Sequence, residues 1–363
     1  MKPSAFLSAY DKLEKLVRRL PEGLQGPILR EITPIKTLFL LQRPPRIVLV
    51  GPSGAGKAEL LTGLFGIELL KPGEENLNEG TWVKFTRSGQ GALQLLDARR
   101  PVSAHLVKAA LAEQPPDIFI FVRPAGDIDD SLAADLDHAA QLLATAEQRH
   151  GGRIKLLGVL VPGAARRDRE RDRQELNACL HTNDALSERM LGTLALGTGA
   201  ESARLAELVA VELPGEAQLE MARLSGNKEL QRQISQVVIK SVTAICTAIG
   251  AQPIPLADFP ILTSLQAVMV ASIMHVSGRE MSVKLGGEFI AALGANIGVG
   301  LVLREGTRAV AKFVPMWGNA VSGAIAGAGT YAMGRAATGY FVDGVSLADA
   351  KELFRRRKKE LKG

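Results

Sequence analysis

The sequence has few of the residues on which several classes of protein depend. Aromatic residues make up only 4% of its 363 residues, too few for a stacking surface that binds single-stranded nucleic acid. Cys179 and Cys246 are the only cysteines, too few for a secreted disulfide framework and not spaced for zinc. The five histidines are scattered, with no pair at the spacing of metal ligands. We therefore expect neither a nucleic-acid partner nor a cysteine–histidine metal centre.

The N-terminus also lacks the apolar core of a secretory signal peptide, because charged residues recur throughout residues 1–19. This predicts a cytoplasmic protein. The formal net charge is +6, but the basic residues are spread along the chain and form no single nucleic-acid-binding stripe. A chain of 363 residues is long for one domain and suits two.

One stretch organises the rest of the chain. An apolar, β-branched run at residues 46–50 leads into a glycine-rich loop, a lysine and a helical pattern of leucines, which is the context of a phosphate-binding P-loop. Glycines let the backbone N–H groups of such a loop turn inward onto phosphate oxygens, and the lysine reaches the β and γ phosphates. The residues that we expect to line this phosphate site are Gly51, Ser53, Gly54, Ala55, Gly56, Lys57, Ala58 and Glu59.

One position of the loop departs from the motif. A serine or threonine should follow the lysine, because its hydroxyl coordinates Mg²⁺. Ala58 stands there and has no oxygen to offer. Two interpretations stay open: a loop that still binds phosphate, and a tight strand–helix turn kept only as scaffold.

The residues after the loop predict alternating strands and helices. Strand-like runs occur at 81–86, 92–96, 117–122, 153–161 and 191–196, and the turn cluster at 88–91 predicts a hairpin of the first two. Helical patterns fall between them at 102–113, 130–147, 175–190 and 202–212. This alternation is typical of a doubly wound, mostly parallel sheet, which binds its ligand at the carboxyl ends of the strands.

With residues 56–66 as phosphate loop and first helix, this order resembles the Era-like branch of the small GTPase superfamily. The resemblance implies an α/β P-loop NTPase of the Ras/Era-like G-domain type, with GTP or GDP as ligand. Asp97 falls where the family keeps the aspartate that holds Mg²⁺ through water. It is our candidate metal residue, although Ala58 puts Mg²⁺ binding in question.

Three further elements of the family pattern are altered. Arg100 stands where the family needs a glycine whose N–H contacts the γ-phosphate. Residues 161–164 read Val-Pro-Gly-Ala where the family has Asn-Lys-x-Asp, so the carboxylate that reads guanine is missing, and residues 195–197 match only in part. Each unpaired polar group of the base costs roughly 1–3 kcal/mol. We expect weak, phosphate-led binding in a pseudo-GTPase that regulates or scaffolds; the alternative is an active, GTP-hydrolysing switch.

The second half of the chain is apolar and rich in small residues. Runs without a formal charge occupy 259–278, 289–303 and 313–333, and a proline-punctuated elbow spans 251–260. This half resembles the YcjF-type domain of unknown function, which follows Era-like domains in many bacteria. The matching residues are Leu213, Pro214, Glu216, Ala217, the stretch 249–258, Leu262, Gln266, Met269 and the glycine-rich 318–339. The resemblance implies a bacterial, membrane-associated or membrane-remodelling GTPase-like protein.

These patterns divide the chain into four parts: amphipathic N-terminal helices and a linker at 1–44, the degenerate G domain at 45–213, an all-α apolar domain at 214–346, and a basic helix at 347–363. A soluble helical bundle and peripheral or integral contact with the inner membrane both stay open. We expect a membrane surface or an apolar protein partner to bind through 241–363, where the basic final helix suits anionic lipid. The N-terminal helix at 6–20 either packs on the domain behind it or binds a partner or membrane surface.

Overall fold

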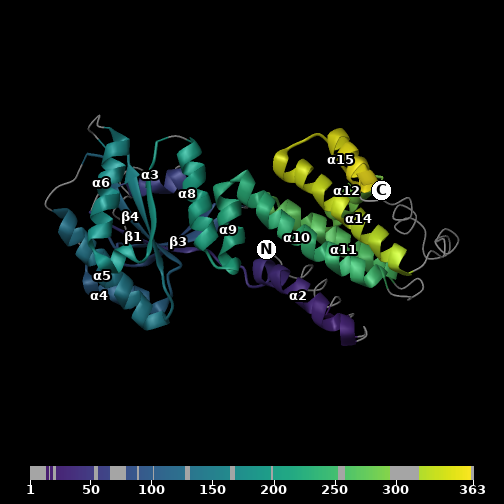
Figure 1. Cartoon of the computed structure of the whole chain (residues 1–363), viewed down its shortest axis with the longest axis horizontal. Helices are drawn as coiled ribbons and strands as arrows, with labels where there is room; N and C mark the ends of the chain where they lie inside the picture. Colours follow the sequence, from purple (N-terminus) through teal and green to yellow (C-terminus); the bar gives the residue numbers. More distant parts are fainter. Residues whose placement is uncertain are drawn as a thin grey trace. The chain divides into compact units, whose positions relative to one another are not determined.

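A computed structural model describes residues 14–15, 17–18, 22–52, 56–65, 79–87, 90–100, 102–126, 131–163, 168–197, 199–251, 258–294 and 319–360. The chain divides into two compact units. An α/β unit comprises Arg43–Asn227, and a helical unit combines the two ends of the chain, Met1–Gln42 and Lys228–Gly363 (Figure 1). Most of the predicted N-terminal helix at 6–20 lies outside the described residues.

The α/β unit is built on a six-stranded sheet with the strand order β2-β3-β1-β4-β5-β6. Among the described strands, only the hairpin of β2 with β3 is antiparallel, and the other pairings are parallel. The predicted hairpin and the mostly parallel α/β sheet are therefore confirmed. The strands are β1 (Arg46–Val50), β2 (Trp82–Arg87), β3 (Gly91–Asp97), β4 (Ile118–Pro124), β5 (Lys155–Val161) and β6 (Met190–Ala195).

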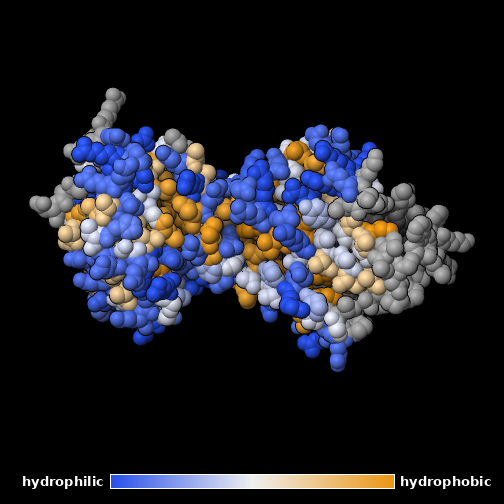
Figure 2. Space-filling model, in the orientation of Figure 1, coloured by the Kyte–Doolittle hydropathy of each residue, from blue (hydrophilic) through white to orange (hydrophobic). Residues whose placement is uncertain are grey.

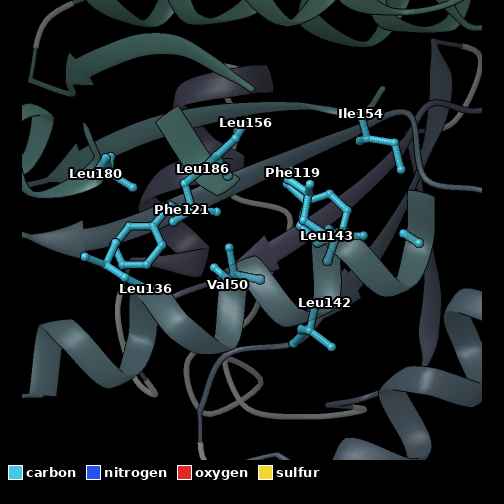
Figure 3. Packing of buried hydrophobic residues seen from close by; sticks show 14 of the residues in the cluster. Val50, Phe119, Phe121, Leu136, Leu142, Leu143, Ile154, Leu156, Leu180 and Leu186 are labelled. Carbon is cyan, nitrogen blue, oxygen red and sulfur yellow. The ribbon is translucent and has the colours of Figure 1, made fainter. Parts of the chain in front are cut away.

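Helices cover both faces of this sheet. On one face, alternate residues of β1, β4 and β5 pack with α4 (Ala104–Glu113), α5 (Ser131–His150) and α6 (Arg169–Thr182) into one apolar cluster (Figure 3). Val50, Phe119, Phe121, Leu142 and Leu156 belong to it. Their neighbours in the strands point to the other face, where α3 (Lys57–Phe65), α8 (Gly199–Glu212) and α9 (Gly215–Ser225) pack. Because β1 and β4 are buried on both faces, their sequences are continuous apolar runs.

The helix predicted at 175–190 begins earlier and ends earlier in the structure. α6 starts after Asp168, whose carboxylate caps the N–H of Glu170 at 3.1 Å. It ends at Asn183, whose side chain accepts a hydrogen bond from Leu186 and opens the short helix α7 (Asp184–Ser187). Local capping by short polar side chains decided both ends.

The boundary between the units also differs from the one expected at 213/214. Helix α9 packs against β3, and Glu220 on α9 accepts a hydrogen bond of 2.8 Å from the N–H of Ala92. The chain enters β1 through Arg43, whose guanidinium forms two hydrogen bonds, of 2.7 and 2.8 Å, with Asp117. These contacts make α9 and Arg43 parts of the α/β unit.

The helical unit packs helices from both ends of the chain. Residues 1–44 were expected to hold amphipathic helices and a linker; within them, α2 (Glu22–Phe39) is 18 residues long and contains Pro27 and Pro34. Burial of Ile28, Ile32 and Phe39 in the unit compensates for the lost backbone hydrogen bonds. The other elements are α10 (Lys228–Gly250), α11 (Asp258–Val276), α12 (Val283–Ala292), α14 (Asn319–Thr338), the π-helical turn η2 (Gly339–Asp343) and α15 (Leu347–Glu360).

Close contact between α10 and α14 depends on glycine. A Cβ atom on Gly327 would lie 2.2 Å from the hydroxyl oxygen of Thr247, and one on Gly334 would lie 2.5 Å from Ile239. Small residues let two helix backbones approach this closely.

Within the described residues, one helix is long and apolar enough to cross a membrane by length and composition. It is α10, and 56% of its apolar window is buried inside the structure, as in the core helix of a bundle. The stretch Leu262–Val276 of α11 is apolar but shorter. Residues 295–318, which hold parts of two runs singled out in the sequence, lie outside the described residues.

Candidate functional site

The P-loop stretch connects β1 to α3 at the carboxyl edge of the sheet. Gly51 and Gly56 have φ angles of +130° and +52°, which side chains rarely permit. A Cβ on Gly51 would meet the carbonyl oxygen of Val122 at 2.2 Å, and one on Gly56 would meet Val161 at 2.3 Å. Both positions therefore require glycine. Ser53, Gly54 and Ala55 lie outside the described residues.

Lys57 opens α3 and is buried. Its ammonium lies 3.0 Å from Oδ2 of Asp97, the last residue of β3, and both side chains are 2% exposed. The structure thus brings together the predicted phosphate lysine and the predicted metal aspartate. Ala58 is half-buried, and Glu59 points to solvent.

Arg99 completes this cluster. Its Nε donates a hydrogen bond to Oδ1 of Asp97 and its Nη2 donates one to Oδ2, each of 2.8 Å. The main-chain N–H of Arg99 also donates to Oδ1, at 3.4 Å. Burial by itself would raise the pKa of Asp97. The hydrogen bonds from Arg99, with the charges of Arg99 and Lys57, outweigh burial and hold the pKa of this carboxyl below its usual value. Asp97 is therefore an ionised carboxylate with hydrogen-bond donors on both oxygens.

A second buried ion pair lies beside the first. Asp135, on the inner face of α5, accepts a hydrogen bond of 2.7 Å from Nε of Arg100 and one of 3.2 Å from Nη1 of Arg123, which is on β4. Arg123 and Asp135 are at most 1% exposed. The N–H of Arg100 donates a hydrogen bond of 2.9 Å to the carbonyl of Gly51. The segment after β3 is thus attached both to the P-loop and to α5.

His138 lies one turn further along α5, and its Nε2 is 3.0 Å from the carbonyl oxygen of Ala98. Burial lowers the pKa of His138, and the nearby charge of Arg100 acts in the same direction. The imidazole is therefore neutral near pH 7, with its Nε2–H donating to the carbonyl.

The residues at this site do not fit Mg²⁺. The metal would need the hydroxyl that Ala58 lacks, and both oxygens of Asp97 already accept hydrogen bonds from cationic side chains. Mg²⁺ prefers oxygen ligands in octahedral geometry. In the part of the chain that the structure describes, no three histidine, cysteine or acidic side chains converge as a metal site.

Val161 and Gly163 belong to the stretch that would contact a base, and both lie close to neighbouring residues. Val161 packs against the backbone of Gly56, and a Cβ on Gly163 would lie 2.1 Å from the carbonyl oxygen of Ala125. Pro162 is exposed, and Ala164 lies outside the described residues.

Sequence reasoning missed Arg99, Arg123 and Asp135 as parts of the site. Arg123 near the end of an apolar strand, and Asp135 beside Leu132 and Leu136 on a helix, were available signals, because charged residues are buried only when paired. Which charges pair could not be read from the sequence, because Lys57 and Asp97 lie 40 residues apart and Arg100 and Asp135 lie 35 residues apart.

The fold and the site together define a class of protein. A strand, a loop with obligatory glycines, and a buried lysine opening a helix, in a mostly parallel sheet, constitute a P-loop-type α/β domain. A helical unit accompanies it.

Comparison with known proteins adds little to this class. No family model matches the chain, and no curated protein matches it. Among solved structures, a chain of the signal recognition particle receptor SRb-GTP/SRX complex from Chaetomium thermophilum matches at 19% identity with a TM-score of 0.26. The match covers 44% of this chain and 95% of that chain.

Proposed function

We propose that this protein is a pseudo-GTPase of the Era-like type, which binds the phosphates of a nucleotide weakly and uses its helical unit to contact a membrane or an apolar protein partner. The observation that carries the first part is the buried Lys57 at the N-terminus of α3, next to a loop whose Gly51 and Gly56 allow no side chain. The N–H groups of a helix N-terminus and a lysine together attract phosphate.

Two contacts support weak binding over an active switch. The N–H of Arg100, at the position that would contact a γ-phosphate, already donates to Gly51, and the Arg100 side chain binds Asp135. A GTPase switch requires a segment that γ-phosphate contacts order and that hydrolysis releases. The segment after β3 has its own hydrogen bonds in place of such contacts.

The proposal that the helical unit contacts a membrane or an apolar partner rests on the residues at its surface. Val237, Leu285 and Ile325 are between 39% and 48% exposed, and they come from α10, α12 and α14. On the face seen in Figure 2, hydrophobic residues reach the surface of this unit among hydrophilic ones. The exposed Arg355, Arg356 and Arg357 of α15 add positive charge that suits anionic lipid.

Titration of the full chain with fluorescently labelled GTP, GDP, ATP and ADP tests the nucleotide part of the proposal. We expect dissociation constants above about 1 μM, with less than about tenfold preference for guanine over adenine, because described residues 161–163 offer no carboxylate to the base. Submicromolar GTP affinity with strong discrimination against ATP would instead indicate an active, guanine-specific switch. No binding of any of the four would leave the loop as scaffold alone.

A further inference from the structure

The pairing of Asp97 with Arg99 concerns the neutralisation of the negative charge of a phosphate group bound at the loop. In a P-loop NTPase, Mg²⁺ bridges phosphate oxygens and neutralises their charge. Here the side chain at the metal-holding position is already bound on both oxygens by a guanidinium, and Arg99 is 1% exposed. A guanidinium stays charged at every physiological pH.

We propose that Arg99 takes the place of Mg²⁺, so that the α/β unit binds the phosphates of a nucleotide without a divalent cation. The inference rests on the proposed function and deepens it, because it names the group that neutralises the phosphate charge. Arg99 acts as a positioning residue: it supplies fixed positive charge next to Lys57 and occupies the carboxylate that a metal would need.

The geometry of the three side chains carries this inference. Lys57 and Arg99 both contact Oδ2 of Asp97, at 3.0 and 2.8 Å, so two cations share one carboxylate. These three side chains have a net charge of +1, which attracts an anion and repels a second cation.

The absence of a hydroxyl at position 58 also argues against binding of Mg²⁺, and it concerns a different part of the chain. Ala58 lies one residue after Lys57 on α3, whereas Arg99 follows β3. One position removes a metal ligand, and the other supplies a cation to the remaining candidate ligand. Both changes lower the affinity for a metal ion, and the charge of Arg99 also lowers the need for one.

The test compares the affinity of the full-length protein for labelled GDP in excess Mg²⁺ and in EDTA, with inorganic pyrophosphate as unlabelled competitor. We expect the two dissociation constants to agree within about threefold, that is, within about 0.7 kcal/mol. Binding that is tighter in Mg²⁺ by more than this overturns the inference and leaves the proposed function standing. No binding under either condition overturns both.

Arg99→Gln supplies the second arm. We expect it to weaken GDP binding in EDTA by about tenfold or more, because the fixed positive charge beside Lys57 is lost. Mg²⁺ should now restore part of the affinity, because the carboxylate of Asp97 is released from the guanidinium. Arg149→Gln, the same change at an exposed residue near the C-terminus of α5, is the control and should leave both values unchanged.

An equal loss of affinity with and without Mg²⁺ in Arg99→Gln would assign Arg99 a purely structural role and overturn the inference. If circular dichroism shows that this variant does not fold, Arg99→Lys, which keeps the charge, replaces it. Arg99→Lys should bind GDP equally in Mg²⁺ and in EDTA, and a new dependence on Mg²⁺ would count against the proposal. The comparison of GDP affinity in Mg²⁺ and in EDTA on the unmodified protein tests the inference even if every variant fails to fold.

Discussion

The main-chain N–H of Arg100 donates a hydrogen bond of 2.9 Å to the carbonyl oxygen of Gly51. This bond joins the first residue of the P-loop to the third residue after Asp97, where a GTPase of the Era-like type would present a glycine to the γ-phosphate. A backbone group that is already paired has less to gain from a new ligand. The contact therefore links the altered residue at 100 directly to the expectation that hydrolysis is lost.

We predict negligible hydrolysis of GTP. Mg²⁺ and a γ-phosphate contact provide much of the charge stabilisation in this class of reaction. With Ala58 after the lysine and Arg100 engaged, phosphate release should not exceed the intrinsic rate of small GTPases, on the order of 10⁻⁴ s⁻¹. Single-turnover release of labelled phosphate measures it. Release well above that rate would mean that other residues position the attacking water.

Lys57→Ala should abolish whatever nucleotide binding the protein has. Lys57 is the only lysine in α3, and phosphate binding by a P-loop depends on the ammonium group of its lysine. Isothermal titration with GDP measures the effect, and Lys108→Ala, at an exposed position of α4, is the matched control. Affinity that survives Lys57→Ala would place the nucleotide elsewhere on the protein.

Asp97→Asn should destabilise the α/β unit by about 3–5 kcal/mol, because it leaves the buried cations Lys57 and Arg99 without their shared carboxylate. Urea unfolding followed by circular dichroism measures the change. Asp137→Asn makes the same substitution at an exposed position of α5 and should cost less than about 0.5 kcal/mol. Equal costs for the two variants would argue against a buried ionic cluster.

His138 should make the stability of the α/β unit depend on pH. Burial lowers the pKa of His138 in the folded state, so the unfolded chain binds the proton more tightly. The free energy of unfolding should therefore fall as the pH drops below about 6.5, the value of an unperturbed histidine. In His138→Gln this part of the pH dependence should disappear. An unchanged slope between about pH 7 and pH 5 would show that His138 is not the responsible group.

The basic final helix should drive binding to anionic membranes. Each arginine near such a surface contributes about 1 kcal/mol, so loss of the three charges alone lowers partitioning by about 100-fold, and changing Arg355, Arg356 and Arg357 to Glu should lower liposome partitioning of the full chain by at least that much. Binding should also weaken as salt rises, because charges are screened over about 10 Å at 0.1 M.

The control for this experiment reverses three exposed basic residues of the α/β unit, Lys108, Arg149 and Arg171, which changes the net charge equally. Co-sedimentation with vesicles containing phosphatidylserine measures both variants. Equal losses would indicate a non-specific effect of net charge. No co-sedimentation of the unmodified chain at any salt concentration would leave an apolar protein as the expected partner of the helical unit.

The sequence by itself determined the local elements of this protein. Glycines at 51 and 56, a β-branched run before them and Lys57 after them specify a strand, a tight loop and a helix through short-range sterics and propensity. The hairpin of β2 with β3 follows in the same way from two strand-like runs separated by a turn cluster.

Only the tertiary structure decided which distant groups meet. The packing of α9 on β3, and of the proline-containing α2 within the helical unit, depends on surfaces that local propensity does not describe. The pairing of Lys57 with Asp97 and of Arg123 with Asp135 requires strands and helices to arrive at one edge of the sheet. Burial then makes these pairings obligatory, since a charge withdrawn from water is retained only beside an opposite one.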